Sequence, residues 1–534
     1  MTIEKKVFAR KASGLIRQIG WIDALFLALA SINPGAGALV YFAFPPSNYA
    51  GCNIPLYILT AALLSTGYVL LYAQFSSAMP RSGGEYMLVS RTFTSLVGFI
   101  VNSTLVVSSL ILIGGILASL TAAFSFLFWE LGLTFQNPVW VLFAVRLWDW
   151  DWMLIIGTIA LLIAFVLMVL PTRFTIKWLI RTFIPLGIAV MILSYILGFL
   201  SSPEVFQQNW NQLVSPYGFT TYNEVLALAE NFGLSYNFQN WLPLSIGASF
   251  FMFWAYAGSQ SASYYAGEIK ESSKTMPIAS LGSLFVAMLI FMIGGFVWPH
   301  VQGYKFLASA GYLYQFHLNE WGMIPTDVSF VLFPNAVWAL ILFIALLGWS
   351  FTLCFMNLFQ NSRCMFAWSF DRIIPDRVSY VHPKWRTPVV AAAIGALIAW
   401  GGLLFSLSPW ALWMVSMNYN FIFIAVMVVI AAAGIFFPFR QKEIFDMAPR
   451  WVRFKIGSIP FMSIWSLITL GISAFMVYTT VTIPAVGGYI DLGTFLLLAG
   501  LFIAGGIIYA VSRWYRLKKE GVDILMASKE VPPV

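Results

Sequence analysis

The sequence predicts an all-α integral membrane protein with about twelve transmembrane helices. Hydrophobic residues make up 60% of the 534 residues and charged residues only 9%, whereas a soluble domain carries roughly 25% charged residues. The chain also holds 48 Phe, 22 Trp and 22 Tyr, an aromatic content typical of interfacial belts. A soluble globular enzyme of this length is therefore excluded. The net charge of +8 is assigned to membrane topology rather than to nucleic acid, because the basic residues lie between apolar runs.

Apolar windows give the number of spans, since a membrane helix needs about 20 apolar residues. Twelve windows are found, at about 19–44, 54–78, 92–128, 153–171, 177–200, 244–267, 277–298, 334–362, 388–406, 410–437, 460–484 and 491–512. The third is long enough for two helices, but no turn signal or charge interrupts it. We therefore expect it to form one span.

Basic residues set the orientation. With twelve spans and the N-terminus inside, the external loops hold only Arg146 and Lys305 of the 29 Lys and Arg. Splitting the third window would move three further basic residues, at 173–181, to the outside. The positive-inside rule thus predicts a multi-pass protein of the cell membrane with both termini in the cytoplasm.

The spans and loops divide the chain into six parts. These are a cytoplasmic N-terminal segment (1–18), a first five-helix unit (19–200), an external loop (201–243), a second five-helix unit (244–437), two further spans (460–512) and a cytoplasmic tail (513–534). A second long external loop covers about 299–333.

Two spans contain residues that a membrane helix avoids. The first carries Ser31 to Gly37 (SINPGAG) near its middle, and the sixth carries Trp254 to Ser261 (WAYAGSQS). Proline removes a backbone donor, and glycine tolerates non-helical angles. The first and sixth spans hold equivalent positions in the two five-helix units, and paired interruptions indicate an inverted-repeat transporter with a site near the bilayer midplane. Either long external loop could then cover the substrate path, or could form plain surface helices.

The two breaks also suggest a ligand. A half-helix that starts near Gly37 directs free N–H groups and a partial positive charge at the break. A half-helix that ends near Trp254 and Ala255 offers free carbonyls and the opposite partial charge. A carboxylate and an ammonium on one carbon would satisfy both, so an amino acid is expected. Trp254 or Tyr256 could cover the ligand, although packing explains these aromatic residues equally well.

Four sequence motifs occur in order along the chain. They are Gly35-Ala36-Gly37, Met79 to Tyr86 (MPRSGGEY), Phe253 to Gly258 running on to Glu268-Ile269-Lys270 and Met276-Pro277, and Arg363 to Pro388. Together they resemble the amino acid–polyamine–organocation (APC) superfamily of secondary transporters, from about residue 15 to about 440. The resemblance implies a five-plus-five inverted repeat of the LeuT-like fold, two extra C-terminal helices, and alternating access.

The resemblance also implies the site. Backbone amides of the first break would bind the α-carboxylate of the substrate, and carbonyls of the second break would bind its α-amine. The candidate substrate-binding residues are Asn33, Gly35, Ala36, Gly37, Phe253, Trp254, Ala255, Tyr256 and Gly258. No cofactor and no metal site is expected.

The coupling ion stays open at this point. Many relatives have a glutamate two residues after the span-6 glycine, where this chain has Gln260. Some relatives have a lysine in span 5, where this chain has Thr182 beside Arg181. Glu85 and Glu268 are carboxylates near the path that could carry a proton, but a role as interfacial anchor or in a gate salt bridge is favoured for each. These five residues are the coupling or gate candidates.

The sequence therefore predicts a secondary active amino acid transporter, with proton coupling favoured over sodium coupling or exchange with a counter-substrate. A neutral or small substrate is preferred, because no acidic side chain is placed to hold a second amine. Transport of amines, polyamines or a divalent metal on the same fold, and a transporter-like sensor, remain alternatives. A membrane enzyme is disfavoured, because the three histidines lie in loops and no acidic pair occupies a span. The expected partners are the substrate, a coupling ion (H+ or Na+) and membrane lipid, without nucleic acid.

Overall fold

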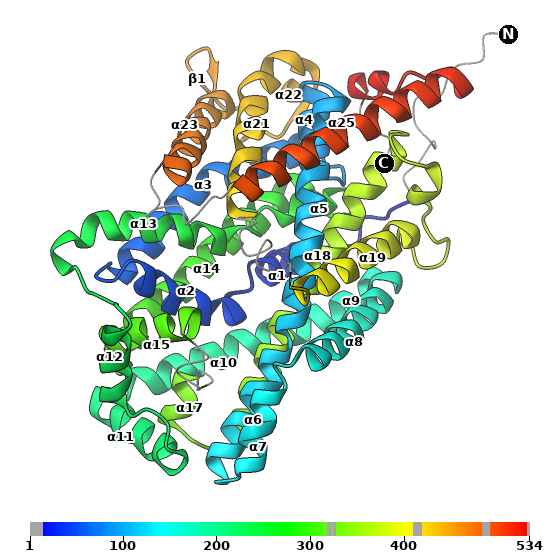
Figure 1. The fold of residues 1–534 in the computed structure, drawn as a ribbon. Coiled ribbons are helices and arrows are strands. Elements are labelled where there is room, and N and C mark those ends of the chain that lie inside the picture. Colours follow the sequence, from blue (N-terminus) through cyan, green and yellow to red (C-terminus); the bar gives the residue numbers. More distant parts are fainter. Residues whose placement is uncertain (1–13, 318–322, 324–326, 410–418, 483–491, 531–534) are drawn as a thin grey trace.

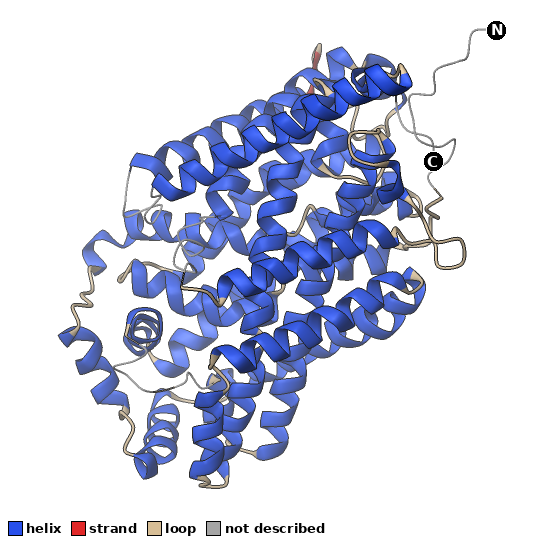
Figure 2. Ribbon diagram, turned by 45° about the vertical axis from the view of Figure 1, so that its right-hand side comes forward, coloured by secondary structure: helices blue, strands red, loops and turns tan. Residues whose placement is uncertain are grey.

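The computed structural model describes residues 14–317, 323, 327–409, 419–482 and 492–530, and these are almost entirely helical (Figure 2). The membrane-length helices are α3 (Ile54–Ala78), α5 (Ser95–Ser119) with α6 (Thr121–Thr134), α8 (Trp150–Val169), α9 (Thr172–Thr175) with the π-helical η1 (Ile176–Ile180) and α10 (Arg181–Phe199), α14 (Ser272–Gln302), α18 (Ala336–Phe370), α19 (Val389–Ser406), α21 (Tyr419–Arg440), α23 (Phe461–Thr482) and α25 (Leu492–Glu520). The predicted all-α membrane protein is confirmed.

In the described part of the chain, ten helices are long and apolar enough to cross a membrane, or eleven if the bent pair Trp21–Gly37 and Val40–Asn48 counts as one span. This pair covers α1 (Trp21–Ile32) and α2 (Pro34–Asn48). The predicted sixth span does not form a continuous helix. It consists of α13 (Trp241–Phe253) followed by the short 3-10 segments η4 (Trp254–Tyr256) and η5 (Ser261–Glu268). The break itself therefore keeps this segment out of the set of long helices.

The long third window forms a single span, as expected. Helices α5 and α6 follow each other directly and together cover 40 residues, Ser95–Thr134. Thr94 caps the start of α5, since its hydroxyl accepts a hydrogen bond from the Val97 amide at 3.3 Å. Figure 1 shows this rod running between the two ends of the molecule, with α4 (Glu85–Thr92) near its first residues and α7 (Pro138–Arg146) beside its last.

The two long predicted loops fold into helices at the α6 end of this rod (Figure 1). We call four of these helices the cap: α11 (Pro203–Val214), α12 (Tyr222–Asn231), α15 (Tyr304–Phe316) and α17 (Val328–Leu332). Thr221 and Glu224 form a capping box at the start of α12. The rings of Tyr222 and Phe306 stack at 4.5 Å and so join the two loops.

The remaining elements are short. They are η2 (Ser215–Tyr217), η3 (Phe238–Asn240), η6 (Asp376–Ser379), α22 (Lys442–Met447), the antiparallel pair β1 (Lys455–Ile456) and β2 (Ile459–Pro460), and η7 (Ile524–Lys529). Buried ion pairing occurs near α4, away from the cap. Arg91 of α4 binds Asp371 at the end of α18 at 2.6 Å, and both side chains are fully buried.

Candidate functional site

The first break lies between α1 and α2. Asn33 adopts a left-handed conformation with a φ of 57°, which ends α1, and Pro34 opens α2 at a position where its missing N–H costs nothing. The Ala36 amide donates to the Asn33 side-chain oxygen at 3.4 Å, and the Gly37 amide donates to the Asn33 carbonyl at 3.0 Å. The first turn of α2 is therefore partly capped by Asn33, through a long bond that a ligand carboxylate could replace.

The second break lies directly against the first. Gly258 has a φ of 157°, and a Cβ atom added to it would lie 2.6 Å from the backbone carbon of Ser31 and 2.7 Å from the amide nitrogen of Ile32. Only glycine permits this approach between two stretches of backbone. The structure thus brings the two predicted breaks together.

Several polar atoms of the second break already have partners. The Tyr68 hydroxyl donates to the Tyr256 carbonyl at 2.8 Å, and the Ala257 amide donates to the Trp254 carbonyl at 3.0 Å. The Gln260 side chain accepts from the Gly258 amide at 3.0 Å, which shapes the turn. Since a carbonyl has two lone pairs, each of these carbonyls keeps the capacity to accept a bond from a ligand ammonium.

The aromatic side chains of the second break pack within the helix bundle. Trp254 meets the ring of Tyr419 edge-on at 4.7 Å, and Phe253 meets Tyr68 at 5.4 Å. Tyr256 is fully buried, and its hydroxyl donates to the Ile58 carbonyl at 3.2 Å. These contacts favour the packing role that the sequence left open for Trp254 and Tyr256.

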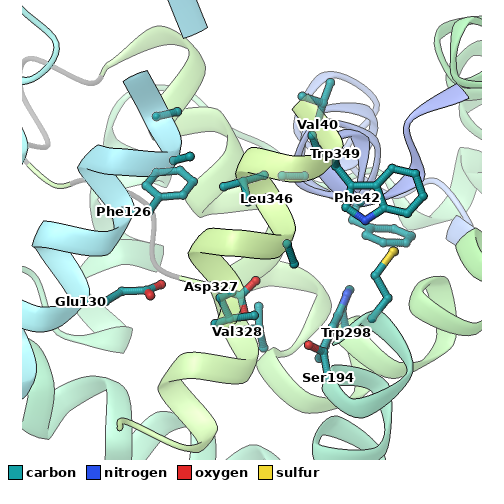
Figure 3. A pocket seen from close by; sticks show the side chains of 18 of the residues that line it. Val40, Phe42, Phe126, Glu130, Ser194, Trp298, Asp327, Val328, Leu346 and Trp349 are labelled. Carbon is teal, nitrogen blue, oxygen red and sulfur yellow. The ribbon is translucent and has the colours of Figure 1, made fainter. Parts of the chain in front are cut away.

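A cavity of about 490 Å³ opens beside the first break (Figure 3). Gly35 and Ala36 line one end of it, together with residues of α10 and α18, and the cap and α6 line the rest. This volume falls within the range of roughly 300–1,000 Å³ that is usual for small-molecule sites. The long predicted loops therefore do contribute walls to a cavity at the candidate site.

Trp349 of α18 also lines this cavity, directly against Gly35, and sequence reasoning missed it. A Cβ atom on either Gly35 or Gly187 would overlap the Trp349 indole. The indole is buried, and its Nε1 has no hydrogen-bond partner within the described residues. No local pattern marks such a residue, because its role depends on two glycines far away in the sequence.

Two acidic residues at the other end of the cavity were also missed as site residues. Glu130 of α6 is only 2% exposed, and its carboxylate accepts a hydrogen bond from the Asp327 amide. Asp327 lines the cavity, and its carboxylate accepts hydrogen bonds from the amides of Ser329 at 2.8 Å and Phe330 at 3.3 Å. Burial raises the pKa of Asp327. The sequence placed these two residues only as acidic residues on the predicted external side of the membrane.

Among the coupling candidates, Glu85 is a fully buried carboxylate. It accepts hydrogen bonds from the Tyr72 hydroxyl at 2.5 Å, from the Asn102 amide at 2.7 Å and from the Tyr264 hydroxyl. All three donors are neutral. Burial raises the pKa of Glu85, and these hydrogen bonds oppose the rise only in part.

Two other candidates form ion pairs that join separate elements. Arg181 of α10 binds Asp23 of α1 through two bonds of 2.7 and 3.0 Å. Glu268 of η5 binds Arg363 of α18 at 2.9 Å, and both side chains are buried. Thr182, the next residue on α10, is exposed. This geometry supports the gate salt-bridge role for Arg181 and Glu268.

Two interrupted helices in contact, with a cavity beside one break, within a bundle of long apolar helices, define a multi-pass membrane transporter. The chain belongs to the amino acid permease family, whose sequence model matches residues 19–508. The predicted membership is confirmed, since this family lies within the APC superfamily.

Curated relatives are distant but similar over most of their length. A branched-chain amino acid permease of Bacillus subtilis is 25% identical over 71% of this chain and 72% of its own. A methylthioribose transporter of the same organism is 23% identical over 74% of this chain and 77% of its own. The cationic amino acid transporter 7 of Arabidopsis thaliana chloroplasts is 23% identical over 90% of this chain and 76% of its own.

Proposed function

We propose that the protein is a secondary active transporter that moves an α-amino acid across the cell membrane by alternating access. The observation that carries this proposal is the contact of Gly258 with the backbone at Ser31 and Ile32. The contact joins the end of α1, directly before α2, to the residue two positions after η4, and so supports a site between the N-terminal amides of α2 and the carbonyls of η4. Helix N-termini bind carboxylates and free carbonyls bind ammonium groups, so this pair of backbone ends suits an amino acid head group. The candidate binding residues keep the roles that the family resemblance implies.

The relatives divide on the side chain of the substrate. One is named for branched-chain and one for cationic amino acids, and both classes share the same head group. The preference for a neutral or small side chain depended on finding no acidic residue at the site. The two breaks therefore support a proposal for the α-amino and α-carboxylate groups of the substrate, and not for its side chain.

Coupling to a proton is favoured, with Glu85 as the proton carrier. It is a buried carboxylate held only by neutral donors, so protonation removes a charge that no basic group compensates. Sodium coupling or exchange is the alternative. The basic surplus between the spans supports cytoplasmic termini. On that orientation the cap is external, and the Arg181–Asp23 and Glu268–Arg363 pairs hold the cytoplasmic side closed.

The first test is thermal stabilisation of the purified protein by a panel of amino acids, polyamines and divalent metals, since a ligand of the native state raises its apparent melting temperature. Amino acids should stabilise the wild type and Gly401→Leu, a control at an open position of α19. They should not stabilise Gly37→Leu. Unaltered affinity in Gly37→Leu would discard the site at the first break. A shift with polyamines or metals alone would favour those rival substrates, and binding without uptake in reconstituted vesicles would favour a sensor.

A further inference from the structure

The cavity beside the first break has two electrically different ends. At one end lie the first residues of α2, Gly35 and Ala36, and the Trp349 indole. This end is electropositive, because a helix N-terminus carries free N–H groups and a partial positive charge. Figure 3 shows Glu130 and Asp327 away from Trp349, with the Glu130 carboxylate directed towards Asp327.

The acidic end has no basic counterpart. Among the described residues that line the cavity, none is Lys, Arg or His. Glu130 receives one hydrogen bond from a backbone amide. In the described part of the chain, the Asp327 carboxylate accepts hydrogen bonds through one oxygen, Oδ1, from Ser329 and Phe330. Two neighbouring carboxylates that share one cavity repel each other unless a positive charge joins them.

A second feature of the wall indicates a ligand. The buried Trp349 Nε1 and the buried Tyr195 hydroxyl both line the cavity and have no hydrogen-bond partner in the described part of the protein. Buried polar groups are normally paired, so these donors are matched to acceptors that a ligand would bring. The Trp349 donor beside Gly35, together with the carboxylates away from it, fits a molecule with an anionic head and a cationic tail.

We infer that the Glu130–Asp327 end of the cavity is a subsite for the positively charged side-chain end of a basic amino acid, an ammonium or guanidinium group. This inference rests on the proposed function, which places the α-carboxylate of the substrate at α2. The sequence found no acid for a second amine, and the structure supplies two.

The walls favour an organic cation over a metal ion. Trp148, Trp210 and Trp298 line the cavity with further apolar side chains, and aromatic faces attract ammonium and guanidinium groups. Hard inorganic cations instead require a shell of about six to eight oxygen ligands.

The test compares L-lysine with L-norleucine, which has the same α-carbon and chain but no ε-ammonium. Binding is measured on the purified full-length protein by ligand-dependent thermal stabilisation and by titration. The wild type should bind lysine roughly ten- to hundred-fold more tightly, as expected for hydrogen bonds to a charged group. Glu130→Gln should lose this preference and keep its affinity for norleucine. Glu230→Gln, at an exposed glutamate of α12, is the matched control and should behave like the wild type.

Equal affinity of the wild type for lysine and norleucine would overturn the inference, whether or not Glu130→Gln folds, and would leave the proposed function intact. Stabilisation by sodium chloride beyond N-methyl-D-glucamine chloride, with no lysine preference, would assign the acidic end to an inorganic cation and also overturn it. If the lysine preference survives in Glu130→Gln and in Asp327→Asn, the charge is recognised elsewhere. If no α-amino acid binds at all, the proposed function fails together with the inference.

Discussion

Gly258 offers the sharpest test of the contact between the two breaks. In Gly258→Ala the new methyl group would lie 2.6 Å from a backbone carbon of Ser31, whereas ordinary contacts of Cβ atoms begin at 3.4 Å. Neither stretch is a flexible side-chain end, so the two breaks must separate to make room. Inserting a methyl group into a well-packed interior costs about 1–3 kcal/mol. The separation should also lower affinity for the amino acid, because the proposed site binds its two charged groups through both breaks.

The expected result is a loss of about 1–3 kcal/mol in the free energy of unfolding and a decrease in affinity of about ten-fold or more, which corresponds to about 1.4 kcal/mol. Unfolding is measured by equilibrium titration in SDS–detergent mixtures, and affinity by ligand titration. Gly401→Ala is the matched control, since an added Cβ there meets nothing within 4 Å, and alanine in a helix interior gains about 0.5–1 kcal/mol over glycine. If Gly258→Ala matched Gly401→Ala in both measurements, the proposed contact between the breaks would be wrong.

Two further predictions concern buried charges. Arg363→Gln should destabilise the protein by about 3–5 kcal/mol, because it leaves Glu268 buried without its partner. Breaking the exposed Lys274–Glu271 pair is the control and should change the free energy of unfolding by less than about 1 kcal/mol. Similar losses for the two variants in SDS unfolding would contradict this prediction. Burial raises the pKa of Glu85 above its ordinary value of 4.5, so its protonated form adds stability that is complete below that value and is lost as the pH rises through the raised pKa. Thermal unfolding across pH should show this decline in the wild type and not in Glu85→Gln, and a decline of the same size in the variant would assign it to another group.

The breaks could be predicted from sequence because their signals are local. Proline at 34 and glycines at 35, 37 and 258 exclude regular helix wherever they stand in a span. The contact between the breaks also followed from local evidence, since equivalent spans of a repeat meet at the site.

The acidic end of the cavity could not be predicted in the same way. Glu130 and Asp327 lie 197 residues apart, and they meet only because the cap folds against α6. Helical phase set a second limit. The sequence could not choose between Arg181 and Thr182. In the structure Arg181 pairs with Asp23, and Thr182 is exposed.

The packing of Trp349 constrains how this chain can diverge. Its indole occupies the space that side chains at 35 and 187 would need, so three positions on three helices share one volume. A homologue that gains a side chain at 35 or 187 must first lose bulk at 349, and a homologue with a small residue at 349 is free to vary at both. Positions 35, 187 and 349 should therefore covary across the family, with a pair of glycines accompanying each aromatic residue at 349.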